Sequence, residues 1–274
     1  MKSLLQVYDL ADGQIETLLE LDGHYEAPNW HQNRNELLIN GGGRLYRVPL
    51  DDPALHLVDT GFCKALNNDH GISPDGVVLY ITDKTETGKA CIYKMPLDEG
   101  VPQRLTENVP SYWHGVSPGG LTLTYAGFRD GVCQIMTSHA DGSNETVLTQ
   151  GFTHCDGPDI SGCGQWIWFN GEKDGAVDLW RMQLDGSALQ QMTDDSRINW
   201  FPHPSPDGQH VLYLSYPEGT KGHPSNMQVR LRLMPAEGGD ARDLVHLFGG
   251  QGTLNVPCWA ADSRRFAFVS YVLS

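Results

Sequence analysis

A turn sequence recurs along the whole chain at nearly constant spacing. Its clearest copies, at 72–76, 116–120 and 204–208, are an apolar residue followed by Ser-Pro-Asp-Gly or a near relative. Looser copies begin at 30, 160 and 259, and the steps between the six copies are 42, 44, 44, 44 and 55 residues. In such turns proline fixes φ and glycine supplies a positive φ. A period of about 40–45 residues is that of a four-stranded propeller blade, so six copies predict six blades.

The segments between the turns have one internal order. A run of β-forming residues follows each turn, then a hairpin whose first strand ends in an acidic turn, then a short last strand. No long stretch shows the 3.6-residue period of a helix. The pattern therefore predicts an all-β chain. The runs after the turns are 77–82, 121–126, 165–170, 210–215 and 265–272.

The two ends of the chain together make one further blade. The segments Leu4–Leu10 and Ile15–Leu21 are predicted to be third and fourth strands, whereas 265–272 supplies a second strand. Joining the ends gives a step of 45 residues between the sixth and first copies. Pairing them removes the exposed edges of an open sheet. We therefore expect residues 1–274 to form a single six-bladed β-propeller domain with a composite last blade.

Composition limits the partners and the compartment. Acidic residues outnumber basic ones 34 to 19, which gives a net charge of -15 and argues against nucleic acid and anionic membranes as partners. No apolar run approaches the roughly 18 residues of a membrane helix. The apolar stretch at the N-terminus is too short for a signal peptide, and the six cysteines form no CxxC pair. We expect a cytoplasmic protein, and the oligomeric state stays open.

The repeated units resemble the propeller repeats of the TolB family, on the strength of Ser73-Pro74-Asp75-Gly76 and its copies. The resemblance extends over essentially the whole chain and implies the six-bladed fold. It does not imply the Tol–Pal role, because many unrelated proteins carry this repeat. We expect neither the separate N-terminal domain nor the export signal of TolB.

Differences between the blades point to a site at the mouth of the central channel. Three residues before the serine of each turn, four blades have proline, whereas two have His70 and His114. Side chains two residues apart on a strand share a face, so polar residues just upstream are expected to face the same mouth. The predicted substrate-binding residues are Glu26, Asn68, Tyr112, Trp113, Asn199, Trp200, Gln251 and Asn255.

Histidines in matching positions on adjacent blades favour a metal site. Imidazole suits manganese, zinc, iron or nickel, so we predict a divalent ion held by His70 and His114, with His203 as the third ligand. His154 and His223 are weaker candidates. The alternative is that these histidines hydrogen-bond the backbone of a neighbouring blade.

The spacing between the fifth and sixth copies is 55 residues against 44 elsewhere. The excess lies in 217–226 and 248–255, both rich in glycine or proline. These segments are either tolerated loop growth or a partial lid that contributes His223 or Gln251.

Two functions remain open. The first is an enzyme acting on a carbohydrate, a lyase or a hydrolase, because amides and carboxylates bind hydroxyls while Tyr112, Trp113 and Trp200 offer apolar faces. Its catalytic residues would be Asp69, His70, His114 and Asp156, with an aspartate as the base. The resemblance adds that some oligogalacturonate lyases are propellers that bind manganese. The second is a non-catalytic scaffold that binds a protein or peptide, with the aromatic residues as packing.

Overall fold

The repeated turn is held by the same hydrogen bonds in successive copies. Ser73 Oγ donates to Asp75 Oδ1 (2.5 Å) and accepts from the Val78 N–H (2.9 Å). The Gly76 N–H donates to the Ser73 carbonyl (2.8 Å) at a φ of 79°, which a residue with a Cβ rarely adopts. Ser205 Oγ makes the equivalent two bonds in the fifth copy. The sequence repeat thus encodes the same hydrogen-bonded turn between the first two strands of successive blades.

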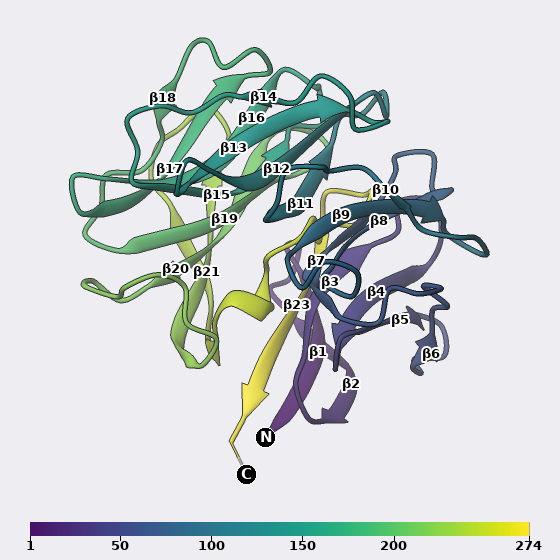
Figure 1. Cartoon of the computed structure of the whole chain (residues 1–274). Coiled ribbons are helices and arrows are strands. Elements are labelled where there is room, and N and C mark those ends of the chain that lie inside the picture. The colour runs from purple at the N-terminus through teal and green to yellow at the C-terminus, as the bar shows by residue number, and fades with distance from the viewer. Residues whose placement is uncertain (274) are drawn as a thin grey trace. The chain divides into compact units, whose positions relative to one another are not determined.

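A computed structural model describes residues 1–273. The fold is an all-β six-bladed propeller with four-stranded blades, which confirms the predicted fold (Figure 1). Within these residues the one helical element is a short 3₁₀ turn, η1 (Gln251–Thr253). Over the same residues no helix has the length and apolar character needed to cross a membrane.

By internal contacts the chain divides into two compact units. The first unit is Met1–Trp113 with Gly252–Ser274, and the second is His114–Gln251. The sheets of the first unit have the orders β2-β1-β23, β3-β4-β5-β6 and β10-β9-β8-β7. Their strands are β1 (Lys2–Asp9), β2 (Ile15–Asp22), β3 (Tyr25–Trp30), β4 (Glu36–Gly41), β5 (Arg44–Pro49), β6 (His56–Leu57), β7 (Leu66–Ile72), β8 (Val78–Asp83), β9 (Cys91–Pro96), β10 (Gln103–Arg104) and β23 (Arg265–Val272).

The second unit holds two complete sheets, β15-β16-β17-β18 and β19-β20-β21-β22, and most of the sheet β11-β12-β13-β14. The boundary between the units falls inside β11. The strands are β11 (Ser111–Val116), β12 (Thr122–Arg129), β13 (Val132–His139), β14 (Thr146–Val147), β15 (His154–Ile160), β16 (Trp166–Lys173), β17 (Ala176–Gln183), β18 (Gln190–Gln191), β19 (Ile198–Pro204), β20 (His210–Tyr216), β21 (Met227–Pro235) and β22 (Arg242–Gly249).

The blade predicted from both chain ends is present. Strand β1 pairs antiparallel with β23 over its full length, from Lys2 opposite Val272 to Asp9 opposite Arg265, and β2 pairs with β1 on the other side. An isolated bridge between Trp259 and Phe266 takes the place of the innermost strand. The composite blade is therefore confirmed, with three regular strands and one bridge.

Four innermost strands contain a β-bulge at the predicted channel mouth. Strand pairing shifts between residues 26 and 29, 66 and 70, 156 and 159, and 200 and 203. In three of them the residue before the proline has a positive φ: Ala27 (58°), Gly157 (57°) and Phe201 (53°). A bulge inserts an extra residue and re-aims the side chains that follow. The expectation that residues two apart share a face is therefore wrong across these bulges.

Apolar side chains fill the space around the strands in each unit. In the first unit one buried cluster includes Leu38, Leu79 and Tyr93, and in the second unit another includes Phe169 and Trp180. Burial of such side chains is the main favourable contribution to folding. It also fixes the strands on which the polar residues below are mounted.

A buried carboxyl group in the second unit makes stability depend on pH. Asp178 on β17 is 5% exposed and accepts hydrogen bonds from Thr193 Oγ1 and Gln191 Nε2, both at 3.0 Å. Burial raises its pKa to about 6, despite these bonds. In the unfolded chain the pKa of this carboxyl group is about 3.9, so the folded chain binds the proton more tightly. The folded chain therefore loses stability as pH rises from about 4 to 6.

We expect the Asp178→Asn variant to gain about 1–2 kcal/mol relative to wild type across that pH window, a figure reduced for partial hydration of the carboxyl group. Denaturant unfolding of both proteins at a series of pH values measures the difference. A difference that stays constant from about pH 4 to 6 contradicts the raised pKa.

Candidate functional site

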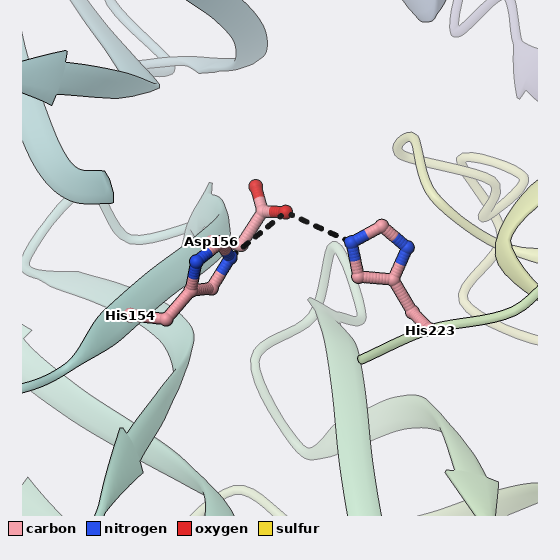
Figure 2. A group of neighbouring side chains, drawn as sticks. All are labelled: His154, Asp156 and His223. Carbon is pink, nitrogen blue, oxygen red and sulfur yellow. Dashed lines mark ion pairs between the residues drawn. The ribbon is translucent and has the colours of Figure 1, made fainter. Parts of the chain in front are cut away.

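One strand and one loop of the second unit bring three donor groups together. His154 and Asp156 lie two residues apart on β15, before its bulge, and therefore project from one face. His223 lies on the loop between β20 and β21. Figure 2 shows the Asp156 carboxylate between the two imidazole rings, with Oδ2 at 3.8 Å from His154 Nε2 and 3.6 Å from His223 Nε2. The ligand atoms of the three residues lie within 4.8 Å of one another.

A third imidazole contacts the other oxygen of the same carboxylate. His114 on β11 is 3% exposed, and its Nε2 lies 3.2 Å from Asp156 Oδ1. The Gly157 N–H also donates to Oδ1 (2.8 Å). Both oxygens of Asp156 thus have nitrogen neighbours, which fixes the orientation of the carboxylate.

The charges of the group follow from this geometry. Burial is the largest influence on Asp156 and opposes its ionisation, yet the neighbouring histidines hold its pKa well below the usual range. Burial likewise opposes protonation of His154, but the nearby Asp156 carboxylate outweighs it and raises the pKa of His154. Burial lowers the pKa of His223. The carboxylate is therefore anionic at neutral pH, and His223 is uncharged with a lone pair available.

Two aromatic rings border the group. The Trp200 ring centroid lies 4.4 Å from that of His223 and 5.7 Å from that of His154, and the Phe201 centroid lies 5.4 Å from that of His223. Trp200 and Phe201 are 2% and 1% exposed. A wall that excludes water strengthens electrostatic interactions inside it.

The bulges of β15 and β19 determine the positions of the Trp200 and Phe201 rings. Gly157 has a φ of 57°, and a Cβ on it would lie 2.7 Å from the Phe201 ring. The Phe201 N–H donates to Asn170 Oδ1 (3.0 Å), a fully buried side chain of β16. Glycine at 157 and asparagine at 170 therefore allow Phe201 to pack directly against Gly157, the residue after Asp156.

The loop that carries His223 is anchored at Pro224. Tyr216 Oη donates to the Pro224 carbonyl (3.0 Å). Gly250 packs against the same segment at a φ of 147°, and a Cβ on it would overlap the Pro224 carbonyl and Ser225. Residues 224–225 are thus held in place next to His223.

We expect Gly250→Ala to destabilise the second unit by about 1–3 kcal/mol, because the added methyl group must displace the main chain of the loop. Gly219→Ala is the matched control, since Gly219 also has a positive φ (76°) but has nothing within 4 Å of the added carbon. The free energies of unfolding of the two variants measure the effect. Equal losses would contradict a loop held against Gly250.

The three donors fit a divalent transition metal. Two imidazole nitrogens and one carboxylate oxygen are ligands that manganese, iron, zinc and nickel accept. His154 Nε2 is buried without a hydrogen-bond partner among residues 1–273, although buried polar atoms normally have one. A metal ion would satisfy this atom.

This group differs from the predicted ligand set. His203 Nδ1 lies 2.9 Å from Asp159 Oδ2, so that nitrogen is already occupied. His70 is fully buried, and burial lowers its pKa to about 4; neither of its ring nitrogens has a hydrogen-bond partner among the described residues. Of the predicted ligands, only His114 contacts the group, through Asp156. The bulges explain the difference, because they remove the common register on which the prediction rested.

Several predicted substrate-binding residues have structural roles. Asn199 is fully buried, accepts from Ser215 Oγ (2.7 Å) and donates to Asp195 Oδ1 (3.0 Å). Trp113 is 1% exposed, and its ring stacks on that of Tyr80 at a centroid distance of 5.6 Å. These contacts favour the packing interpretation for both. Tyr112 and Gln251 are half-buried and lie outside the group.

The remaining predicted residues gather in the first unit. Asn255 Nδ2 donates to Asp69 Oδ1 (2.8 Å), and Asn68 Nδ2 donates to Glu26 Oε2 (3.2 Å). Asp69, Asn68 and Asn255 are buried. This cluster of amides and carboxylates shares no residue with the histidine group of the second unit.

The sequence gives a partial indication of the histidine group. The spacing of His154 and Asp156 places both on one face of a strand, which a search for paired donors at i and i+2 would find. His223 has no such pattern, because only the fold of its loop brings it to β15. Both histidines rank as weaker candidates from the sequence.

Comparison with known proteins identifies one full-length relative. The chain is 44% identical over 272 residues to the uncharacterized protein Atu1656 of Agrobacterium fabrum, covering 99% of this chain and 93% of that protein. No family model matches the chain. The solved structure of a TolB candidate from Agrobacterium tumefaciens has a TM-score of 0.98 and 44% identity, covering 100% of this chain and 99% of that one.

More distant structures share the fold alone. The crystal structure of TolB from Acinetobacter baumannii has a TM-score of 0.68 at 19% identity, covering 88% of this chain and 65% of that one. An oligogalacturonate lyase in complex with manganese has a TM-score of 0.56 at 13% identity, covering 89% and 67%.

Proposed function

We propose that this chain, a member of the TolB-like propeller family that includes Atu1656, is a metal-dependent enzyme acting on a carbohydrate. His154, Asp156 and His223 hold the divalent ion, and the reaction is a lyase or hydrolase step. The cytoplasm is its proposed location, in keeping with six cysteines that are all free.

One observation carries the proposal: three nitrogen and oxygen donors from two separate segments converge within 4.8 Å. Catalytic metal sites have few protein ligands and keep a position open for water or substrate. Three ligands leave such a position. A manganese-bound lyase with the same general fold supports the choice of reaction class.

The residues around the metal have distinct roles. The ion would supply Lewis acidity toward a carboxyl or hydroxyl oxygen of the substrate. Asp156 provides the negative charge of the site, and His114 orients its carboxylate from the opposite oxygen. Trp200 and Phe201 keep water away from the ligand nitrogens.

Turnover on a panel of neutral and uronic oligosaccharides tests the function. Ultraviolet absorbance detects the unsaturated product of a lyase, and reducing-end assays detect a hydrolase. We expect metal-dependent turnover by wild type, loss of it in His223→Ala, and its retention in His246→Ala, whose histidine is 63% exposed in the same unit. Metal binding without turnover on any sugar would overturn the carbohydrate assignment. Turnover unaffected by His223→Ala would overturn the site.

A further inference from the structure

Three arginines of the second unit gather on one face of the sheet β19-β20-β21-β22. In the paired strands β20 and β21, Arg232 lies opposite Tyr213. Arg230 lies opposite Ser215, two residues along, so both arginines project from the same face. Arg197, just before β19, reaches this face because its Nε donates to Ser215 Oγ (2.8 Å) and its Nη2 donates to the Ser215 carbonyl (3.0 Å). The Arg197 guanidinium is thus held on the residue directly across from Arg230.

Among the described residues, these three guanidinium groups form ion pairs with only two carboxylates. Arg230 Nη1 lies 2.8 Å from Asp243 Oδ2, and Arg232 Nε lies 3.0 Å from Asp243 Oδ1. Arg232 also contacts Asp195 through Nη1. Arg197 forms no ion pair within residues 1–273, and its pKa is lowered first by burial and then by the positive charges of Arg230 and Arg232. One positive charge of the cluster is therefore left without an ion-pair partner, although the whole chain has a net charge of -15.

Two buried donors of the same cluster lack an acceptor. Tyr213 is 0% exposed, and its Oη has no hydrogen-bond partner among the described residues. The Arg232 guanidinium lies over the Tyr213 ring, 5.6 Å from its centroid. Arg232 Nε is also buried, and despite its short distance to Asp243 it makes no hydrogen bond within residues 1–273. Buried polar atoms normally have a partner, so the cluster is short of acceptors as well as of negative charge.

The cluster is accessible to a ligand through Arg230 and Arg197. The Arg230 side chain is 38% exposed, and Arg197 is half-buried. Residues directly opposite on paired strands have Cβ atoms about 4.5–5.5 Å apart, so Arg230 starts beside the hydroxyl group that holds Arg197. Arg197 Nη1 and Arg230 Nη2 donate no hydrogen bond within residues 1–273. Two neighbouring guanidinium groups with unused N–H donors suit the oxygens of one anion.

We infer that Arg197 and Arg230 bind an oxyanion, the carboxylate or phosphate group of a small molecule. The planar guanidinium fork matches both groups and stays charged at every pH the protein experiences. Asp243 and Asp195 hold Arg232 and Arg230 in place, whereas the oxyanion supplies the negative charge that Arg197 lacks. The inference does not rest on the proposed metal chemistry, because the cluster shares no residue with the histidine group.

Calorimetric titration with inorganic phosphate, glucuronate and glucose tests the inference, because glucuronate and glucose differ only in the carboxylate or hydroxymethyl group at one carbon. We expect wild type to bind phosphate or glucuronate at least about tenfold more tightly than Arg230→Gln does, the effect of one charged hydrogen-bonding group. The tighter of the two ligands identifies the kind of oxyanion. Arg242→Gln is the control and should bind like wild type. It removes the same charge from an exposed residue of β22 that lies opposite Leu233, not opposite the cluster.

Wild type that binds neither oxyanion, or oxyanion binding that is equally tight in Arg230→Gln, would overturn the inference. Arg197→Gln should weaken binding to a similar extent, and Arg230→Gln carries the test even if Arg197→Gln does not fold, because the Arg230 side chain is partly exposed. In His223→Ala oxyanion binding should remain, which separates this site from the proposed metal site. Binding that is lost in His223→Ala but kept in Arg230→Gln would place the anion at the histidine group and overturn the inference.

Discussion

Replacing Asp156 with asparagine is expected to lower the affinity for a divalent metal ion by at least about a hundredfold, more than the effect of losing a group that only orients a ligand. Asparagine keeps the shape of the side chain but removes the negative charge. In wild type that charge lies 3.2–3.8 Å from three imidazoles, on a side chain that is 15% exposed. The remaining ligands would then be neutral imidazoles, which bind divalent ions less strongly without a carboxylate.

Competition with a coloured chelator measures this affinity in wild type and in Asp156→Asn. Asp141→Asn is the control, because Asp141 is an exposed turn residue of the same unit. The control should bind metal like wild type. An Asp156→Asn variant within about threefold of wild type would contradict the assignment of Asp156 as a ligand.

Replacing Trp200 with alanine is expected to lower the free energy of unfolding by about 3–5 kcal/mol, the range for truncating a buried large aromatic residue. Trp200 is 2% exposed and contacts the rings of His154, Phe201 and His223. Its Nε1 is buried without a hydrogen-bond partner among the described residues, so the loss comes from packing. Trp200→Phe should recover most of the stability.

Denaturant unfolding of the two variants measures this effect. Leu189→Ala, at a residue that is 45% exposed, is the control and should cost no more than about 0.5 kcal/mol. A loss of less than about 1 kcal/mol in Trp200→Ala would mean that the aromatic wall is not a packed part of the second unit.

The fold was predictable because each repeat contains a turn whose sequence is recognisable. Ser73 and Ser205 make equivalent hydrogen bonds to their own turns, so a local pattern of four residues marks each blade. The composite blade was predictable from spacing alone, since β1 and β23 complete one period. Both inferences rest on interactions that are local or periodic in the sequence.

The site was only partly predictable because it depends on departures from that period. The bulges at Gly157 and Phe201 each add one residue to the strand, so the side chains after them face the opposite side from the one expected. A prediction in which side chains strictly alternate between the two faces of a strand does not include this change. His114 was found because it stands where four other blades have proline, and Asp156 because it belongs to the series of polar and aromatic residues two positions upstream. His223 reaches Asp156 through a loop whose path is set by Tyr216 and Gly250, and these contacts leave no pattern in the sequence.

Metal content measured by plasma mass spectrometry on untagged protein tests whether His154, Asp156 and His223 hold a metal ion. Wild type, His154→Ala, His223→Ala and the His246→Ala control are each incubated with manganese, zinc and nickel and then desalted. We expect close to one ion per chain in wild type and in the control, and little metal in the other two variants. Wild type that retains no metal, or that retains it equally after loss of His154 or His223, would contradict a metal centre at Asp156.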